Sequence, residues 1–147
     1  MDHDLVYSLA NLLVLPAWIA LLVRPSWRFG TDVLAPLITP GAMALLYVVY
    51  ISLALTGDGP GGFSSLSELG LGFSEPVGAM AGWAHYLVAD VFLGSWALRE
   101  SRRLGIRHRT MVPVLLLFLI LMPIGFLTYL AVRARHTGFT ISAGRGA

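Results

Sequence analysis

Four long apolar runs follow one another along the chain, and each is bounded by charged or by glycine- and proline-rich residues. The runs cover about residues 5–23, 33–56, 76–98 and 111–132. Because a helix rises about 1.5 Å per residue, about 20 apolar residues cross a hydrocarbon core of roughly 30 Å. The pattern therefore predicts an all-α integral membrane protein with four transmembrane helices in a single bundle, and one transmembrane domain over residues 1–147.

The first run has a competing interpretation as a cleaved signal peptide. Its acidic start, MDHD, lacks the positive region that precedes the apolar part of such a peptide, so we expect a retained helix with a kink at Pro16. Residues 57–75 form a long glycine-rich loop, in which residues 63–73 suit a re-entrant or surface-lying piece. Residues 99–110 form an arginine-rich loop.

The arginines predict the orientation of the four helices. Seven follow the first and third runs, whereas the remaining three lie in the C-terminal tail. Arginine is enriched in cytoplasmic loops, so the two arginine-rich turns are expected in the cytoplasm and both termini outside. In a bacterium this would be the inner or plasma membrane.

Composition supports the membrane class and excludes several others. Hydrophobic residues make up 56% of the 147 residues and charged residues only 12%, which is about half the share of a soluble domain. The absence of cysteine excludes disulfides and thiolate chemistry. All ten basic residues are arginines, without the aromatic-interleaved surface that binds nucleic acid, so no nucleic-acid partner is expected.

The third run is the functional candidate because it carries His85 and Asp90 near its centre. An ionisable side chain at that depth costs about 2.5–3.5 kcal/mol on insertion scales and faces protein, water or a ligand. At about 100° per residue the two side chains lie about 140° apart, flanking one face with Gly78, Gly82 and Tyr86. We expect that face to point inward and the opposite face to point to lipid. The opposite face holds Val77, Ala84, Val88, Val91, Ser95 and Leu98.

Other polar residues fall in the same half of the bilayer if four helices span it. We expect a shared polar pocket with Asp90 below it and Glu75 at its mouth, lined by Asn11, Tyr47, Tyr50, His85, Tyr86, Thr128 and Tyr129. A purely structural role competes for each: Asn11 as interhelical glue, the tyrosines as interface anchors, and His85 and Asp90 as packing contacts. One His and one Asp, even with Glu75, are too few for a zinc site, so no metal is expected and the sequence implies no cofactor.

Several motifs in this order resemble the abscisic-acid-deficient-four-like family. They are NLLVLPAW at Asn11–Trp18, GWAHYLVADVFLGSW at Gly82–Trp96, Glu100 and Arg103 followed by LGI, and MPIGFL at Met122–Leu127. The family comprises small membrane proteins whose plant members are required to form neoxanthin from violaxanthin. One departure is Ser95, where relatives tend to have arginine.

The resemblance implies a lipid-soluble, carotenoid-like isoprenoid as ligand, and an isomerisation that opens an epoxide and leaves an allene. It suggests His85 and Asp90 as acid and base. The ligand-binding residues are then Asn11, Trp18, Tyr47, Gly82, Trp83, Tyr86 and Trp96, and further motif positions are Glu100, Arg103 and Pro123. Two alternatives stay open, a non-catalytic carotenoid or lipid binder and a proton-coupled small carrier. Membrane lipids are the other expected partners, and the small residues also allow a homo-oligomer.

Overall fold

The computed structural model describes residues 2–137, and every regular element in that range is a helix. In chain order the elements are α1 (His3–Leu22), the π-helical segment η1 (Phe29–Ile38), α2 (Thr39–Thr56), α3 (Leu66–Ser74), α4 (Pro76–Arg103), α5 (His108–Ile120) and α6 (Met122–Thr137). The all-α prediction is thus confirmed for residues 2–137.

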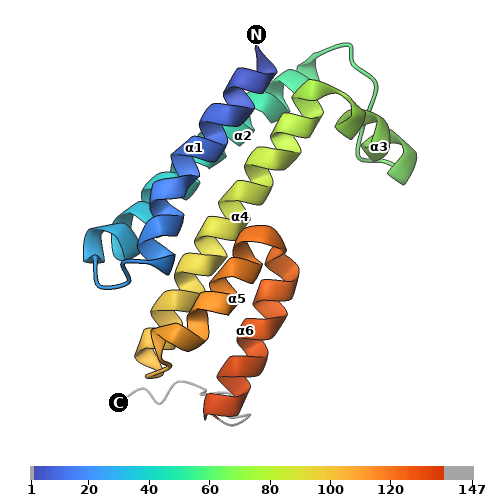
Figure 1. Ribbon diagram of the computed structural model, residues 1–147. Coiled ribbons are helices and arrows are strands. Elements are labelled where there is room, and N and C mark those ends of the chain that lie inside the picture. Colours follow the sequence, from blue (N-terminus) through green and yellow to red (C-terminus); the bar gives the residue numbers. More distant parts are fainter. Residues whose placement is uncertain (1, 138–147) are drawn as a thin grey trace, which may run out of the picture.

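Helix α4 is the centre of the molecule and contacts all six other elements (Figure 1). Three segments are long and apolar enough to cross a membrane: α1, the continuous stretch Phe29–Thr56 formed by η1 and α2, and α4. They agree with the first three predicted spans. Because α1 and α4 run in one direction and α2 in the other, the start of α1 and the end of α4 lie at opposite ends of the bundle (Figure 1).

The predicted fourth span over residues 111–132 is wrong. The chain breaks at Leu121, and α6 turns back along α5, so that the two helices form a hairpin beside the second half of α4 (Figure 1). The far end of α6 returns to the turn before α5, where His136 Nε2 lies 3.0 Å from the carbonyl oxygen of Leu104. Neither helix of the hairpin is among the segments long enough to span a membrane.

Pro123 and Gly125 explain why the apolar run reverses. Proline lacks an N–H, so it suits the first turn of α6, where that donor would have no helical partner. A Cβ on Gly125 would lie 2.5 Å from the backbone nitrogen of Phe118, so only glycine lets α6 approach α5 this closely. The hydroxyl of Tyr86 donates to the carbonyl oxygen of Ile120 (3.1 Å), which satisfies a helix-end acceptor at membrane depth.

The hairpin also corrects the expected distribution of charge. Arg133 and Arg135 were expected opposite the arginine-rich turns, but α6 brings them back to the same end of the bundle. All nine arginines of residues 2–137 therefore lie at that end: Arg24, Arg28, Arg99, Arg102, Arg103, Arg107, Arg109, Arg133 and Arg135. We call it the arginine end. The described chain starts at the other end of the bundle, where α1 begins at His3, and its last described residue, Thr137, lies at the arginine end. The predicted side of the C-terminus itself falls on residues 138–147, outside the described residues.

Both predicted loops contain more helix than expected. Helix α4 continues to Arg103, so the arginine-rich loop 99–110 shrinks to the short turn before His108. The re-entrant or surface-lying piece expected near residues 63–73 coincides with a short helix, α3. The Ser65 hydroxyl accepts from the backbone N–H of Glu68 (3.2 Å), which caps the start of α3.

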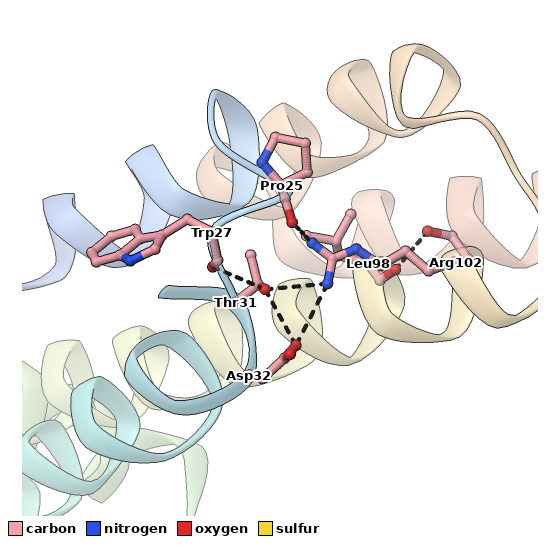
Figure 2. Close-up of polar contacts among 7 residues, drawn as sticks. Pro25, Trp27, Thr31, Asp32, Leu98 and Arg102 are labelled. Carbon is pink, nitrogen blue, oxygen red and sulfur yellow. Dashed lines mark hydrogen bonds and ion pairs between the residues drawn. The ribbon is translucent and has the colours of Figure 1, made fainter. Parts of the chain in front are cut away.

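The arginine end is held together by a polar cluster around Arg102, shown in Figure 2. The guanidinium donates to Thr31 Oγ1 (3.1 Å), to Asp32 Oδ1 (3.5 Å) and to the carbonyl oxygen of Pro25. These contacts tie the end of α4 to η1 and to the turn that precedes it. The α1–η1 turn is thereby fixed against α4, on which the candidate site is built.

The face of α4 expected to meet lipid is instead its most buried face. Ala84, Val91 and Ser95 are fully buried, and Leu98 is 1% exposed. Helix α2 and η1 pack against α4 and provide much of this cover. Since aliphatic side chains suit a protein core as well as lipid, hydropathy could not distinguish the two.

Candidate functional site

A groove opens between α2, α3 and α4 in the half of the molecule away from the arginine end. Its volume is about 390 Å³, and its lining is mainly apolar or glycine. From α2 come Tyr47 and Ile51, from α3 Leu69 and Phe73, and from α4 Gly78, Gly82 and His85, with Glu75 just before α4. We refer to this cavity as the groove.

Two glycines of α4 make the groove by letting α3 lie close. A Cβ on Gly78 would overlap the carbonyl oxygen of Gly72, and a Cβ on Gly82 would lie 2.5 Å from the ring of Phe73. The small-xxx-small pair thus accommodates a neighbouring backbone, as its spacing predicts. The neighbour is the short helix α3, so that α3 forms one wall of the groove.

His85 projects from α4 into this groove, and its side chain is exposed. Its ring lies beside that of Tyr47, with 5.7 Å between the centroids and 42° between the planes. Within residues 2–137 the imidazole nitrogens make no hydrogen bond to the protein, so both are available to a ligand. His85 lies nine residues after Pro76, which is about 14 Å along α4, or about half the roughly 30 Å thickness of a hydrocarbon core.

Asp90 lies on a different side of α4 and is 1% exposed. It occupies the same helical stripe as Trp83 and Gly94, which are seven and four residues away. The ring of Trp83 contacts Tyr7 (5.3 Å between centroids), and the indole of Trp18 packs over Gly94. Asp90 therefore faces the contact between α1, α4 and the tip of the hairpin, which we call the seam.

The seam carries most of the aromatic residues singled out from the sequence. The ring of Trp83 stacks on that of Tyr86, with 5.5 Å between the centroids and 21° between the planes. The Tyr86 hydroxyl donates a hydrogen bond to the Ile120 carbonyl oxygen at the hairpin tip. Asn11 lies one turn beyond Tyr7 on α1 and donates to the carbonyl oxygen of Tyr7 (2.8 Å). Asp90 Oδ1 and Trp83 Nε1 are buried without a hydrogen-bond partner in the described chain. His85 and Asp90 are thus not brought together.

The other predicted site residues mainly hold helices together. The Trp18 indole would be 3.0 Å from a Cβ on Gly94, which explains why glycine stands there. Trp96 meets Tyr129 edge-on (5.2 Å), joining α4 to α6. Glu100 pairs with Arg103 (3.8 Å), as their spacing predicted. The single shared pocket is therefore wrong, because the hairpin removes Tyr129 from the half in which the groove lies.

Sequence reasoning missed the contribution of α3, whose Leu69 and Phe73 line the groove. A signal was present, since Ser65 followed by Glu68 before apolar residues is typical of a helix start. The reversal at Pro123 also had a signal in the proline and glycine that interrupt the apolar run. As for metals, residues 2–137 contain no group of three or more His, Asp or Glu side chains placed to hold an ion.

Comparison with known proteins identifies the family. No curated protein and no solved structure matches the chain. The family model described as ABA DEFICIENT 4-like matches residues 5–129, which reach from the first turn of α1 into α6 and include the groove, the seam and the hairpin tip. Since this match covers most of the 147 residues, the chain belongs to the ABA DEFICIENT 4-like (ABA4-like) family.

Proposed function

We propose that this protein binds a carotenoid-like isoprenoid from the bilayer in the groove and isomerises it there, with His85 as the proton-transfer group. The observation that carries the proposal is an unpartnered imidazole exposed at membrane depth inside an apolar groove. The class of ligand is proposed from the resemblance to the neoxanthin-forming members of the family, to which the chain belongs. The groove supplies a mainly apolar cavity for it between α2, α3 and α4.

The chemistry suits a single imidazole. Opening an epoxide to an allene moves one proton: a C–H bond loses its proton, the C–O bond breaks, and the oxygen gains a proton. Imidazole accepts and donates protons near neutral pH, so His85 can take the carbon-bound proton and return it to the oxygen. Tyr47, beside His85, can donate a hydrogen bond to that oxygen.

The size of the groove indicates which part of the ligand it holds. A cavity of about 390 Å³ is at the small end of the range for drug-sized ligands, so it suits one ring-bearing end of a long isoprenoid. The polyene then extends into lipid along exposed apolar residues of α3 and its loop. Phe63 is 70% exposed and Phe73 52% exposed on that side.

A non-catalytic binder is the second candidate, and the position of Asp90 favours it. The groove holds one proton-transfer group at depth, whereas Asp90 lies on the other side of α4. A pair of acid and base was expected from the sequence, and half of it is absent from the groove. A protein with the same groove could hold a pigment without converting it.

Copurification and turnover test both candidates. The protein is purified from carotenoid-producing cells, and its extract is analysed by absorbance and mass spectrometry. We expect a bound isoprenoid at about one per chain, and product after incubation with an epoxidised carotenoid in vesicles. A bound ligand without turnover would exclude the isomerase and support the non-catalytic binder. A preparation free of isoprenoid that also fails to take one up from pigmented vesicles would refute both.

We also propose that the arginine end faces the cytoplasm and the start of α1 faces outward, following the arginine distribution. Single cysteines test this in intact cells with an impermeant thiol reagent, because the chain has none of its own. Ser67→Cys on α3 should label from outside. Arg107→Cys and Arg135→Cys should both label only after lysis. If Arg135→Cys alone labelled from outside, residues 111–132 would cross the membrane as a fourth span.

A further inference from the structure

A second cavity lies at the arginine end, between the start of α5 and the end of α6. Its volume is about 360 Å³, and it is lined by Gly105, Ile106, Arg107, Thr110, Val132, Arg135 and His136. These residues come from the turn before α5, the first turn of α5 and the last turns of α6. The bond between His136 and the carbonyl oxygen of Leu104 (3.0 Å) holds the two walls together.

The positive charges around this cavity are not balanced by residues 2–137. The ion pairs within residues 2–137 are Arg102 with Asp32 and Arg103 with Glu100. The side chains of Arg107 and Arg135 make no hydrogen bond or ion pair with any residue in that range, and Asp32 and Glu100 are the only acidic side chains at this end among the described residues. Two guanidinium groups from different segments therefore line one cavity without an anionic partner.

From this arrangement we infer that the cavity binds the phosphate of an anionic membrane lipid, with Arg107 and Arg135 as its ligands. The planar guanidinium fork matches phosphate oxygens in pairs, and the Thr110 hydroxyl offers a further donor. The floor is apolar at Ile106 and Val132, which suits the glycerol and first methylenes of a lipid. The arginine end also lies where the three spanning helices leave the membrane, at headgroup level.

Such a lipid would join the two ends of the hairpin. Arg107 precedes α5 and Arg135 is in the last turn of α6, so a phosphate held by both would link the two helices. A ligand that binds only the folded hairpin stabilises it by mass action. The lipid site is independent of the groove and of the reaction proposed there, since the two cavities share no lining residue.

The test uses the full-length protein in neutral detergent. Phosphatidylglycerol, phosphatidylcholine or inorganic phosphate is added, bound lipid is counted by native mass spectrometry, and the melting temperature is followed. We expect phosphatidylglycerol to bind and to raise the melting temperature. Phosphatidylcholine and millimolar inorganic phosphate should do neither. Full competition by inorganic phosphate would overturn the lipid assignment in favour of a soluble phosphate compound.

Three double variants separate binding in this cavity from a general effect of positive charge. Arg107→Gln with Arg135→Gln should weaken phosphatidylglycerol binding at least roughly tenfold, as expected for lost charge-assisted hydrogen bonds. Arg24→Gln with Arg28→Gln removes the same charge at the same end, outside the cavity, and should bind as the wild type does. An equal loss of phosphatidylglycerol binding in both glutamine double variants would overturn the assignment of the lipid to this cavity. Arg107→Lys with Arg135→Lys keeps the charge and the fold, and undiminished binding by this variant would overturn recognition by the guanidinium forks.

Discussion

The two sides of α4 carry one ionisable residue each at membrane depth, yet they are built differently. On the groove side, glycines and a short surface helix leave His85 exposed to a cavity. On the seam side, aromatic rings and the hairpin tip close over Asp90, which is 1% exposed. Depth in the bilayer is similar for both, so access distinguishes them: a ligand can reach His85 without moving a helix, whereas Asp90 is enclosed by protein.

The largest effect we expect separates the two sides by activity. His85→Ala should lower conversion of the isoprenoid by roughly 100- to 10,000-fold, because it removes the positioned proton-transfer group. Its melting temperature should hardly change, since the side chain is exposed and makes no hydrogen bond in the described chain. Turnover in vesicles and thermal unfolding in detergent measure the two quantities.

Asp90→Asn is the matched variant for the other side of α4, and Phe92→Ala is a control at an exposed position of the same helix. Both should retain conversion within several-fold of the wild type. If Asp90→Asn instead loses conversion and His85→Ala keeps it, the reaction belongs to the seam. Loss in both with unchanged stability would restore the acid–base pair expected from the sequence, through a ligand that reaches both sides.

The next effect concerns stability on the seam side. Gly125→Val should destabilise the protein by about 1–3 kcal/mol, because any Cβ at this position would meet the backbone of Phe118 at 2.5 Å, and backbone cannot swing aside. Gly70→Val on α3 is the control, since nothing lies within 4 Å of its added Cβ. Unfolding in detergent should show a lower free energy of unfolding for Gly125→Val and an unchanged one for Gly70→Val. A small loss there would indicate that α6 does not pack so closely on α5.

The sequence predicted the three long helices correctly because about 20 consecutive apolar residues have few other stable arrangements in a bilayer. It failed for residues 111–132, where hydropathy is the same for a span and for a hairpin. The reversal depends on two local facts, the missing N–H of Pro123 and the missing Cβ of Gly125. Only the close contact with Phe118 shows that these residues make a turn and not a kink.

For the candidate site, helical spacing predicted His85 and Asp90 about 140° apart and flanking one inward face, whereas in the structure His85 faces the groove and Asp90 is buried on the seam side. It could not show which side is open, because that depends on α3 covering Gly78 and Gly82. The buried aliphatic face of α4 was assigned to lipid for the same reason. Periodicity finds the faces of a helix, but the identity of the neighbour on each face is a tertiary fact.

A smaller effect is expected within the groove, on ligand affinity. Gly82→Ala places a methyl group 2.5 Å from the ring of Phe73, which lies at the far end of an exposed side chain and can move. Moving the ring changes a wall of the groove, so we expect affinity for the isoprenoid to fall by about tenfold, which corresponds to about 1.4 kcal/mol. The melting temperature should change little. Titration with the purified ligand measures the affinity, and unchanged binding would place the ligand away from Phe73.

The smallest effect returns to the seam and tests whether it is a structural contact. Tyr86→Phe keeps the ring stacked on Trp83 but removes the hydroxyl that donates to the carbonyl oxygen of Ile120 (3.1 Å). Interhelical hydrogen bonds in membranes average about 0.6 kcal/mol, and the carbonyl at the hairpin tip would be left without this donor, so we expect a loss of about 0.5–1.5 kcal/mol. Tyr47→Phe is the matched control, because the Tyr47 hydroxyl makes no hydrogen bond to residues 2–137 and lies in the groove. Tyr86→Phe should therefore lower the free energy of unfolding, and Tyr47→Phe should not. Conversion of the isoprenoid should fall in Tyr47→Phe and stay unchanged in Tyr86→Phe. The reverse pattern would show that the seam carries the chemistry and the groove carries the packing.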